Sequence, residues 1–241
     1  MATPRVPQLM TADTEPDTAD PTVLLTGYEP FGEFSANPAS QLATRLDGLD
    51  RETYTIVGRE LPVVFDRAAA ELTAAIDEHD PELVCALGLA AGRPALSLER
   101  VGINLRDTSS AGVPDNDERR VVDDPVVADG PGAYFATLPL RAMKAAMRDA
   151  GVPTRLSTDA GTHLCNNLLY TARHVSETAA TNHEFGAGFV HVPLSHEQAA
   201  ARDEGEPSMA LETMREGVLV GLEAACKHVS RPDGRARAGA E

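Results

Sequence analysis

The sequence predicts an α/β protein, a three-layer α/β/α sandwich built on a mostly parallel, twisted sheet. Short apolar runs alternate with amphipathic helical patterns from residue 22 to residue 228, which is typical of strands connected by helices. The run at residues 82–87 is apolar on both faces, as expected for a central parallel strand. No linker-like segment divides the 241 residues, so we expect one domain.

In the first half of the chain, Asn37 followed by Pro38 indicates a helix start, with Asn as the cap and Pro at the first helical position. Pro81 ends a later amphipathic pattern, and residues 88–93 are expected to form a flexible loop. The expected strands cover residues 22–26, 53–61, 82–87 and 97–105, and the expected helices cover residues 38–46 and 66–79.

In the second half, residues 107–129 are acidic and aperiodic, which predicts an irregular surface segment. Gly151 closes a predicted helix. The expected helices cover residues 138–150, 164–174 and 208–228, and the expected strands cover residues 152–156 and 188–193. Strands and helices that alternate in this way imply a sheet covered on both faces.

The two ends differ in composition from the middle. Residues 1–20 are rich in Thr, Asp, Pro and Ala without the apolar core of a signal peptide, so we expect a disordered acidic leader. Residues 231–241 are expected to be a disordered tail, which leaves residues 21–230 as the α/β domain. No stretch reaches the apolar length of a membrane span, so we expect no membrane association.

The charge balance is strongly acidic, with a formal net charge of -16 and only two lysines, Lys144 and Lys227. This excess argues against a broad basic surface for nucleic acid. We interpret it as the composition of a halophilic protein that stays soluble in concentrated salt, although an ordinary acidic cytosolic protein is the alternative. Three cysteines do not make a disulfide framework, which favours a reducing cytoplasm over secretion.

Cys165 is the candidate nucleophile because of the segment in which it lies. Asp159, Gly161 and Thr162 suit a tight turn and a helix cap between a predicted strand and a predicted helix. Cys165 would then fall in the first helical turn, where unpaired backbone N–H groups and the helix dipole favour an anion. A small buried cysteine that packs this junction is the other interpretation.

Two further residues could complete a thiol triad at strand ends. His191 lies near the end of an apolar strand, and Glu99 lies inside another strand, residues 97–101, with apolar Leu98 and Val101 nearby. The imidazole would take the thiol proton, the carboxylate would orient the ring, and backbone N–H groups near Cys165 would hold an oxyanion. A structural histidine and a plain Glu99–Arg100 pair remain alternatives, and His163 with Cys165 offers too few ligands for zinc.

Taken together, several segments resemble the pyroglutamyl peptidase I (pyrrolidone-carboxylate peptidase) family of cytosolic cysteine peptidases. The segments that carry the resemblance are residues 24–32, 37–38, 61–63, 97–104, 114–116, 130–134, 159–166 and 188–193. The resemblance implies a Glu–Cys–His triad at Glu99, Cys165 and His191. It also implies removal of an N-terminal pyroglutamyl residue from peptides, no metal or organic cofactor, and a homo-oligomer, often a tetramer.

The resemblance also implies a pocket for the lactam ring. Tyr28 and Phe31 occupy the places of the aromatic loop that encloses this ring, and Leu89, His163 and Leu164 are expected beside it. Leu89 replaces a frequent Gln, His163 replaces a frequent aromatic residue, and Gly112 replaces a frequent Arg. A thiol amidase for another small N-acyl or lactam compound, and a catalytically silent binding protein, are therefore the alternative functions.

Overall fold

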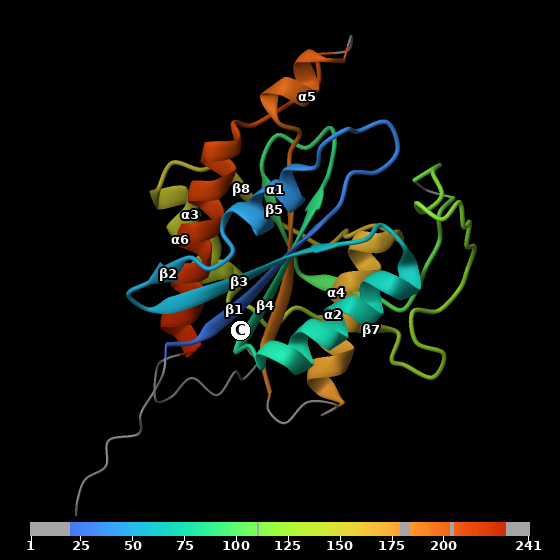
Figure 1. The fold of residues 1–241 in the computed structure, drawn as a ribbon, viewed down its shortest axis with the longest axis horizontal. Coiled ribbons are helices and arrows are strands. Elements are labelled where there is room, and N and C mark those ends of the chain that lie inside the picture. Colours follow the sequence, from blue (N-terminus) through green and yellow to red (C-terminus); the bar gives the residue numbers. More distant parts are fainter. Residues whose placement is uncertain (1–19, 110, 179–183, 203–204, 230–241) are drawn as a thin grey trace, which may run out of the picture.

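The computed structural model describes residues 20–109, 111–178, 184–202 and 205–229 of the chain. The expected leader, apart from Asp20, and the expected tail lie outside the described residues. Within them, a central sheet carries helices on both faces, as Figure 1 shows. The predicted three-layer α/β/α architecture is confirmed.

The central sheet has seven strands in the order β2-β3-β1-β4-β9-β5-β8. Its strands are β1 (Thr22–Tyr28), β2 (Asp50–Arg51), β3 (Tyr54–Leu61), β4 (Leu83–Leu89), β5 (Leu96–Glu99), β8 (Thr154–Ser157) and β9 (Gly186–Val192). Four neighbouring pairs are parallel, whereas β2 pairs antiparallel with β3 and β5 pairs antiparallel with β9. The sheet is therefore mostly parallel, as predicted, but β5 and β8 run against the four central strands.

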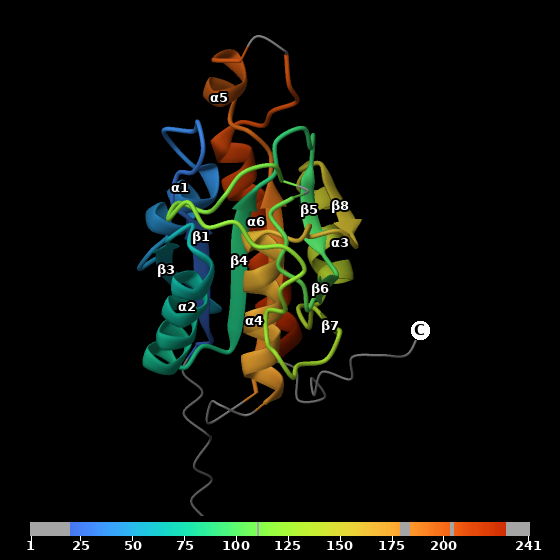
Figure 2. The ribbon, with the colours of Figure 1, turned by 90° about the vertical axis from the view of Figure 1, so that its right-hand side faces the viewer.

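The helices form the two outer layers (Figures 1 and 2). One face carries α2 (Phe65–His79) and α4 (Leu164–Glu177), and the other carries α1 (Pro38–Arg45), α3 (Leu140–Asp149) and α6 (Leu211–Val229). The short helix α5 (His196–Ala200) projects at one end of the molecule, as Figure 1 shows. Figure 2 views the face covered by α2 and α4, and Cys165 packs against the core cluster on this face.

Strand periodicity divides the core into two clusters. In β1, Val23 and Leu25 pack with α1, α3 and α6, while Leu24 between them packs with α2 and α4. Every residue of β4 is buried, as predicted for a strand covered on both faces. The same alternation places residues 187, 189 and 191 of β9 on the α4 face.

The helix signals of the sequence are confirmed. Asn37 caps α1, because its Oδ1 accepts from the Ala39 N–H at 3.0 Å, and Pro38 is the first helical residue. α2 ends at Asp80 in the left-handed conformation, directly before Pro81. Gly151 follows α3 with a φ of 78°, a conformation that favours glycine.

β1 and β4 are longer than predicted. β1 continues to Tyr28, and β4 continues through Gly88 and Leu89, which were expected to lie in a loop. The reason is tertiary, since Gly88 and Leu89 pair with His191 and Val192 of β9. Pairing with a neighbouring strand overrides the weak local preference of glycine for strands.

The prediction of one strand at residues 97–105 is wrong, because the strand is interrupted at Arg100. β5 stays in the central sheet, and β6 (Val101–Ile103) pairs with β7 (Ala133–Phe135) in a separate two-stranded sheet. A Cβ on Gly102 would lie 2.9 Å from the backbone nitrogen of Tyr170 in α4, so β6 lies directly against that helix. The sequence pattern did not reveal β2, β7 or α5.

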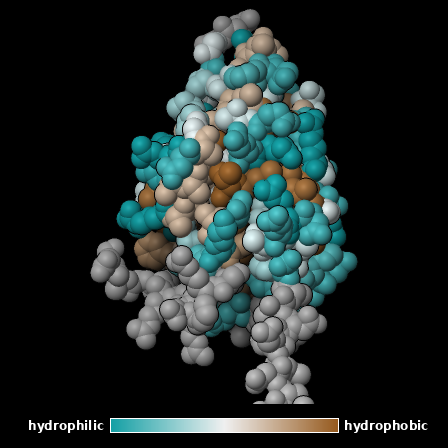
Figure 3. All heavy atoms as spheres, turned by 90° about the vertical axis from the view of Figure 1, so that its left-hand side faces the viewer, coloured by the Kyte–Doolittle hydropathy of each residue, from teal (hydrophilic) through white to brown (hydrophobic). Residues whose placement is uncertain are grey.

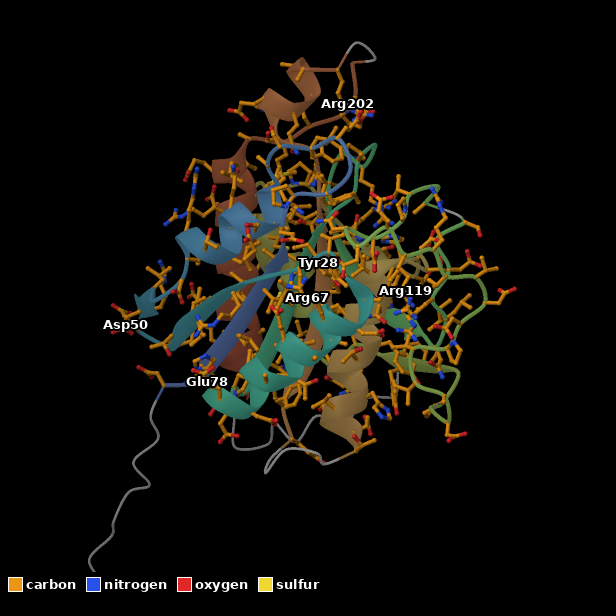
Figure 4. All side chains as sticks on the ribbon, turned by 45° about the vertical axis from the view of Figure 1, so that its right-hand side comes forward. Tyr28, Asp50, Arg67, Glu78, Arg119 and Arg202 are labelled. Carbon is orange, nitrogen blue, oxygen red and sulfur yellow. The ribbon has the colours of Figure 1, made fainter. Side chains whose placement is uncertain are left out.

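The segment at residues 107–129 is irregular, as predicted, but it is not wholly a surface segment. Thr108, Asp115 and Val121 are buried. Arg106 and Arg119 both donate to the carboxylate of Asp66 at the start of α2, and Figure 4 shows Arg119 on this side of the molecule. Ion pairs therefore fasten the segment beside the candidate site.

Polar side chains cover most of the face that Figure 3 shows, and a band of apolar side chains crosses its middle. None of the helices in the described part of the chain combines the length and the apolar character that a membrane crossing needs.

Candidate active site

Cys165 lies in the first turn of α4, as predicted, and is half-buried. The preceding turn is built by Asp159, whose Oδ1 accepts from the Gly161 N–H at 3.0 Å, and by Gly161, whose φ is 77°. The expected cap is wrong: Thr162 donates its hydroxyl to the carbonyl of Asp107, and His163 is the N-cap without a side-chain cap bond. The backbone N–H groups in the first turn of α4 therefore receive no side-chain cap and point out of the N-terminal end of the helix.

Asn166, next to Cys165, fixes the start of α4 against β6. Its Oδ1 accepts from the Ile103 N–H at 2.8 Å, and its Nδ2 donates to the carbonyls of Ile103 and Leu105 at 2.8 and 2.9 Å. The side chain is almost fully buried and uses both of its polar atoms. These hydrogen bonds determine where the first turn of α4, and hence Cys165, lies.

The side chains of Glu99 and His191 contact each other near the first turn of α4. Oε1 of Glu99 lies 2.8 Å from Nδ1 of His191, and both side chains are buried. Glu99 pairs with Phe189 across the antiparallel β5–β9 ladder, so it is the diagonal neighbour of His191 on the same face. Because Nδ1 faces Glu99, Nε2 is the ring nitrogen that remains for the thiol.

The charges of the three groups support one another. Burial alone would lower the pKa of His191, but the charge of Cys165 and its hydrogen bond, followed by those of Glu99, raise this pKa to about 9. Burial alone would raise the pKa of Glu99, but its hydrogen bond with His191 and the charge of that ring lower it below the ordinary value. The site therefore favours a charged imidazolium beside the ionised carboxylate of Glu99.

Gly88 makes room for the sulfur. It pairs with His191 across the β4–β9 ladder. A Cβ at this position would lie 2.9 Å from Sγ of Cys165 and 2.6 Å from Cζ of Phe189. A side chain here would push the thiol away from the imidazole, so the strand needs glycine at this position.

A small pocket opens beside Cys165. It is lined by all five residues expected there, Tyr28, Phe31, Leu89, His163 and Leu164, and also by Asn37 and Val63, which sequence reasoning missed. The hydroxyl of the buried Tyr28 donates to the Leu164 carbonyl at 2.6 Å, and Figure 4 shows Tyr28 near the middle of the molecule. A larger hollow between residues 33–36 and α5 shares no lining residue with this pocket and includes no cysteine.

His163 forms a neutral wall of the pocket. Its ring packs against Phe65 with centroids 5.2 Å apart. Burial lowers its pKa, and the smaller opposing effects of the Val113 backbone and the Asp115 carboxylate do not reverse this shift. Nε2 makes no well-aligned hydrogen bond with any described residue.

Comparison with known proteins identifies the family. The family model described as pyroglutamyl peptidase matches residues 21–228. The chain belongs to the pyroglutamyl peptidase family. It is 44% identical over 211 residues to pyrrolidone-carboxylate peptidase 2 of Photorhabdus laumondii, which covers 88% of this chain and 94% of that protein.

Solved structures agree with this membership. The pyrrolidone carboxyl peptidase of Thermococcus litoralis superposes with a TM-score of 0.84 at 34% identity, covering 92% of this chain and 99% of that one. The pyroglutamyl peptidase I of Bacillus amyloliquefaciens superposes with a TM-score of 0.80 at 31% identity, covering 86% and 96%. The predictions of this family, of an α/β fold and of a cysteine-type hydrolase are confirmed.

The other two cysteines of this pyroglutamyl peptidase family member, Cys85 and Cys226, are not suited to act as nucleophiles. Burial raises the pKa of Cys85 to about 12 and that of Cys226 to about 12. None of the three cysteines forms a disulfide. In the described ranges, no three His, Cys, Asp or Glu side chains are grouped so that they could hold a metal ion.

Besides Asn37 and Val63 in the pocket, sequence reasoning missed Gly88, Asn166 and Arg93, whose Nη1 donates to Oε1 of Glu99 at 2.6 Å. The sequence pattern predicts a loop for Gly88 and Arg93 and indicates no role for Asn166 beyond its place beside Cys165. A Gly in an apolar run and an Asn inside a helix were the available signals, since both residue types need a reason to be there.

Proposed function

We propose that this enzyme hydrolyses the bond after an N-terminal pyroglutamyl residue and releases pyroglutamate and the shortened peptide. One observation carries the proposal: the Cys165 thiol, the His191–Glu99 pair and a small pocket adjoin one another in a member of this family. Pyroglutamyl or pyrrolidone-carboxylate specificity is what the relatives' names state, and here it is part of the proposal.

In the proposed reaction, Sγ of Cys165 attacks the pyroglutamyl carbonyl carbon while His191 holds the thiol proton. Backbone N–H groups in the first turn of α4, including that of Cys165, stabilise the oxyanion. The tetrahedral intermediate collapses when His191 gives its proton to the leaving amine, which forms a thioester and frees the peptide. His191 then takes a proton from water, and the resulting attack releases pyroglutamate and regenerates Cys165.

Glu99 orients His191 in this proposal. Its hydrogen bond to Nδ1 keeps that nitrogen protonated, so Nε2 faces the thiol in the correct tautomer. The carboxylate also stabilises the imidazolium that exists before the amine leaves. Although the side chain is buried, its lowered pKa keeps it ionised throughout the reaction.

The pocket chemistry favours a small uncharged acyl group. Tyr28 and Phe31 supply aromatic walls, and Leu89 and Leu164 supply aliphatic ones. The residues that line the pocket include no Asp, Glu, Lys or Arg. A lactam has no charged amine, so it needs no acidic partner here, whereas an ordinary N-terminus would lose its hydration without compensation.

The test is cleavage of a pyroglutamyl amide by the wild type and by Cys165→Ser, in dilute buffer and in molar salt. We expect cleavage by the wild type and a loss of at least about a thousandfold in the variant. A folded wild type that cleaves no pyroglutamyl amide at either salt concentration overturns the proposed substrate.

A second candidate keeps the thiol chemistry and changes the acyl group. The apolar Leu89 and the neutral ring of His163 give the pocket fewer groups that could read the edges of a lactam. Turnover of acetyl and prolyl amides beside the pyroglutamyl amide separates the two candidates. Faster turnover of the acetyl amide would favour this second function.

Alkylation separates an enzyme from a silent binding protein on the same scaffold. We expect iodoacetamide to label Cys165 much faster than Cys85 and Cys226, whose burial raises their pKa. Peptide mapping of a partly labelled sample measures the three rates. Equal labelling of Cys165 and the buried thiols would support the silent scaffold.

We also propose that the protein works as a homotetramer in a reducing, salt-rich cytoplasm. The net charge of -16 and the absence of a disulfide support the environment, and the tetramer rests on the family resemblance alone. Light scattering in dilute and in molar salt tests both statements. A stable, fully active monomer in dilute buffer would contradict them.

A further inference from the structure

Arg93 lies in the connection between β4 and β5 and reaches three parts of the candidate site. Its Nη1 donates to Oε1 of Glu99 at 2.6 Å, and its Nη2 donates to the carbonyl of Asp159 at 2.8 Å. Nη1 also lies 3.3 Å from Nδ1 of His191. The side chain is mostly buried, with an exposed fraction of 20%, and it does not line the pocket beside Cys165.

One carboxylate oxygen therefore receives two donors. Oε1 of Glu99 accepts from Arg93 and from His191, so neither the carboxylate nor the ring turns without breaking a charge-assisted hydrogen bond. Arg93 also compensates the charge of Glu99, which is fully buried, and an uncompensated charge there would be costly.

The second arm of the guanidinium holds the segment that leads to the nucleophile. Asp159 begins the turn before α4, six residues before Cys165. The planar fork of arginine can reach Glu99 and Asp159 at once, whereas the single ammonium of lysine is a point charge. Arg93 thus connects the residue that orients the base with the turn that places the thiol.

We propose that Arg93 is a positioning residue that holds Glu99 and the turn before Cys165 in register, and so aligns His191 with the thiol. This inference rests on the proposed roles of Cys165, His191 and Glu99. Since Arg93 does not contact the pocket, its loss should reduce the rate of the chemical step and leave substrate affinity nearly unchanged.

The test is a double-mutant cycle of Arg93→Met and Glu99→Gln. We expect Arg93→Met alone to lower kcat by about 10- to 100-fold with KM within about twofold. In the Glu99→Gln background the same change should cost clearly less than in the wild type, because the ionic partner of Nη1 is already lost and only the contact with the Asp159 carbonyl remains. Costs that multiply in the double variant, or a loss carried by KM alone, would overturn the inference.

Two further variants guard against a purely structural effect. Arg93→Lys keeps the charge and should recover part of kcat, and added methylguanidinium should partly rescue Arg93→Ala. Arg100→Met is the matched control, since Arg100 follows Glu99 directly and is exposed. Equal losses in Arg93→Met and Arg100→Met, or no rescue by Arg93→Lys and methylguanidinium, would contradict positioning by Arg93.

The rate at which iodoacetamide labels Cys165 provides a readout that needs no substrate. We expect Arg93→Met to slow this labelling and Arg100→Met to leave it unchanged. If the wild type cleaves no pyroglutamyl amide, the proposed function fails and the labelling result still decides the role of Arg93. Unchanged labelling in Arg93→Met, with circular dichroism like that of the wild type, would reject that role.

Discussion

Glu99 of β5 and His191 of β9 are diagonal neighbours across two antiparallel strands, and Oε1 of Glu99 lies 2.8 Å from Nδ1 of His191. This contact links the short β5–β8 end of the sheet to the parallel strands at its centre. β5 contributes only four residues, so Glu99 is still beside β9 when the strand ends. A buried carboxylate and a buried ring are thus held by backbone pairing rather than by loops.

Glu99→Gln should lower kcat by at least about a hundredfold, because an amide can stabilise the wrong tautomer of His191. The structure of the site should otherwise persist, since Gln has the same shape. Steady-state kinetics on a pyroglutamyl amide measure the change. Glu82→Gln is the control, as Glu82 also accepts a hydrogen bond, from Thr22 at 2.6 Å, but lies outside the site; similar losses in both variants would contradict an orienting role.

Cys165→Ala should lower the pKa of His191 below its value of about 9, because Cys165 is the strongest of the groups that raise it against burial. The imidazole should then lose its proton closer to neutral pH. NMR titration of the ring in the wild type and the variant measures the shift. An unchanged titration would show that the thiol does not contact the imidazole in solution.

The same raised pKa sets the pH dependence of stability. The folded value of about 9 lies above the ordinary value of about 6.5, so the charged ring stabilises the folded state. This contribution is fully present below about pH 6.5 and is lost as the pH rises through about 9. Urea unfolding at pH 6.5 and 9.5 should show a larger loss of stability in the wild type than in His191→Asn, and equal losses would contradict it.

Gly88→Ala should lower activity by more than about tenfold and destabilise the protein by about 1–3 kcal/mol, since the new Cβ meets Phe189 and the sulfur of Cys165. Kinetics and urea unfolding measure the two effects. Gly132→Ala is the matched control, because a Cβ there meets nothing within 4 Å. Full activity in Gly88→Ala would show that the sulfur does not need this space.

Tyr28→Phe removes only the hydroxyl that donates to the Leu164 carbonyl. This carbonyl belongs to the same peptide group as the Cys165 N–H, which the proposed mechanism directs at the oxyanion. A less polarised N–H should lower kcat by about two- to tenfold with little change in KM, and stability should fall by about 1 kcal/mol. An increase in KM with unchanged kcat would instead mean that Tyr28 acts as a pocket wall only.

Much of the fold was predictable because its signals are local. Asn37 and Pro38 specify a helix start by capping chemistry, and Gly151 specifies a helix end by its backbone freedom. The buried strand β4 was visible as a continuous apolar run. Gly88 was read as a loop residue, because its pairing partner His191 is more than a hundred residues away and leaves no local trace.

The candidate site was predictable in its residues but not in its geometry. Cys165, His191 and Glu99 were expected to meet at strand ends of a mostly parallel sheet, yet β5 runs antiparallel to β9 and brings Glu99 in by a diagonal contact. Arg93 was not predicted, since only the folded chain places its guanidinium between Glu99 and Asp159. Thr162 was expected as a cap because its residue type suits one, but its hydroxyl donates to Asp107 instead.

The brevity of β5 has a consequence for how this chain reaches its working state. Successive residues of a strand point to opposite sides, so a slip of one position against β9 would exchange Glu99 for Leu98 or Arg100 in the layer beneath α4. A molecule misassembled in this way would keep most of its core and would still be inert. The correct register of the four-residue strand β5 against β9 therefore decides whether a well-packed molecule is also catalytically active.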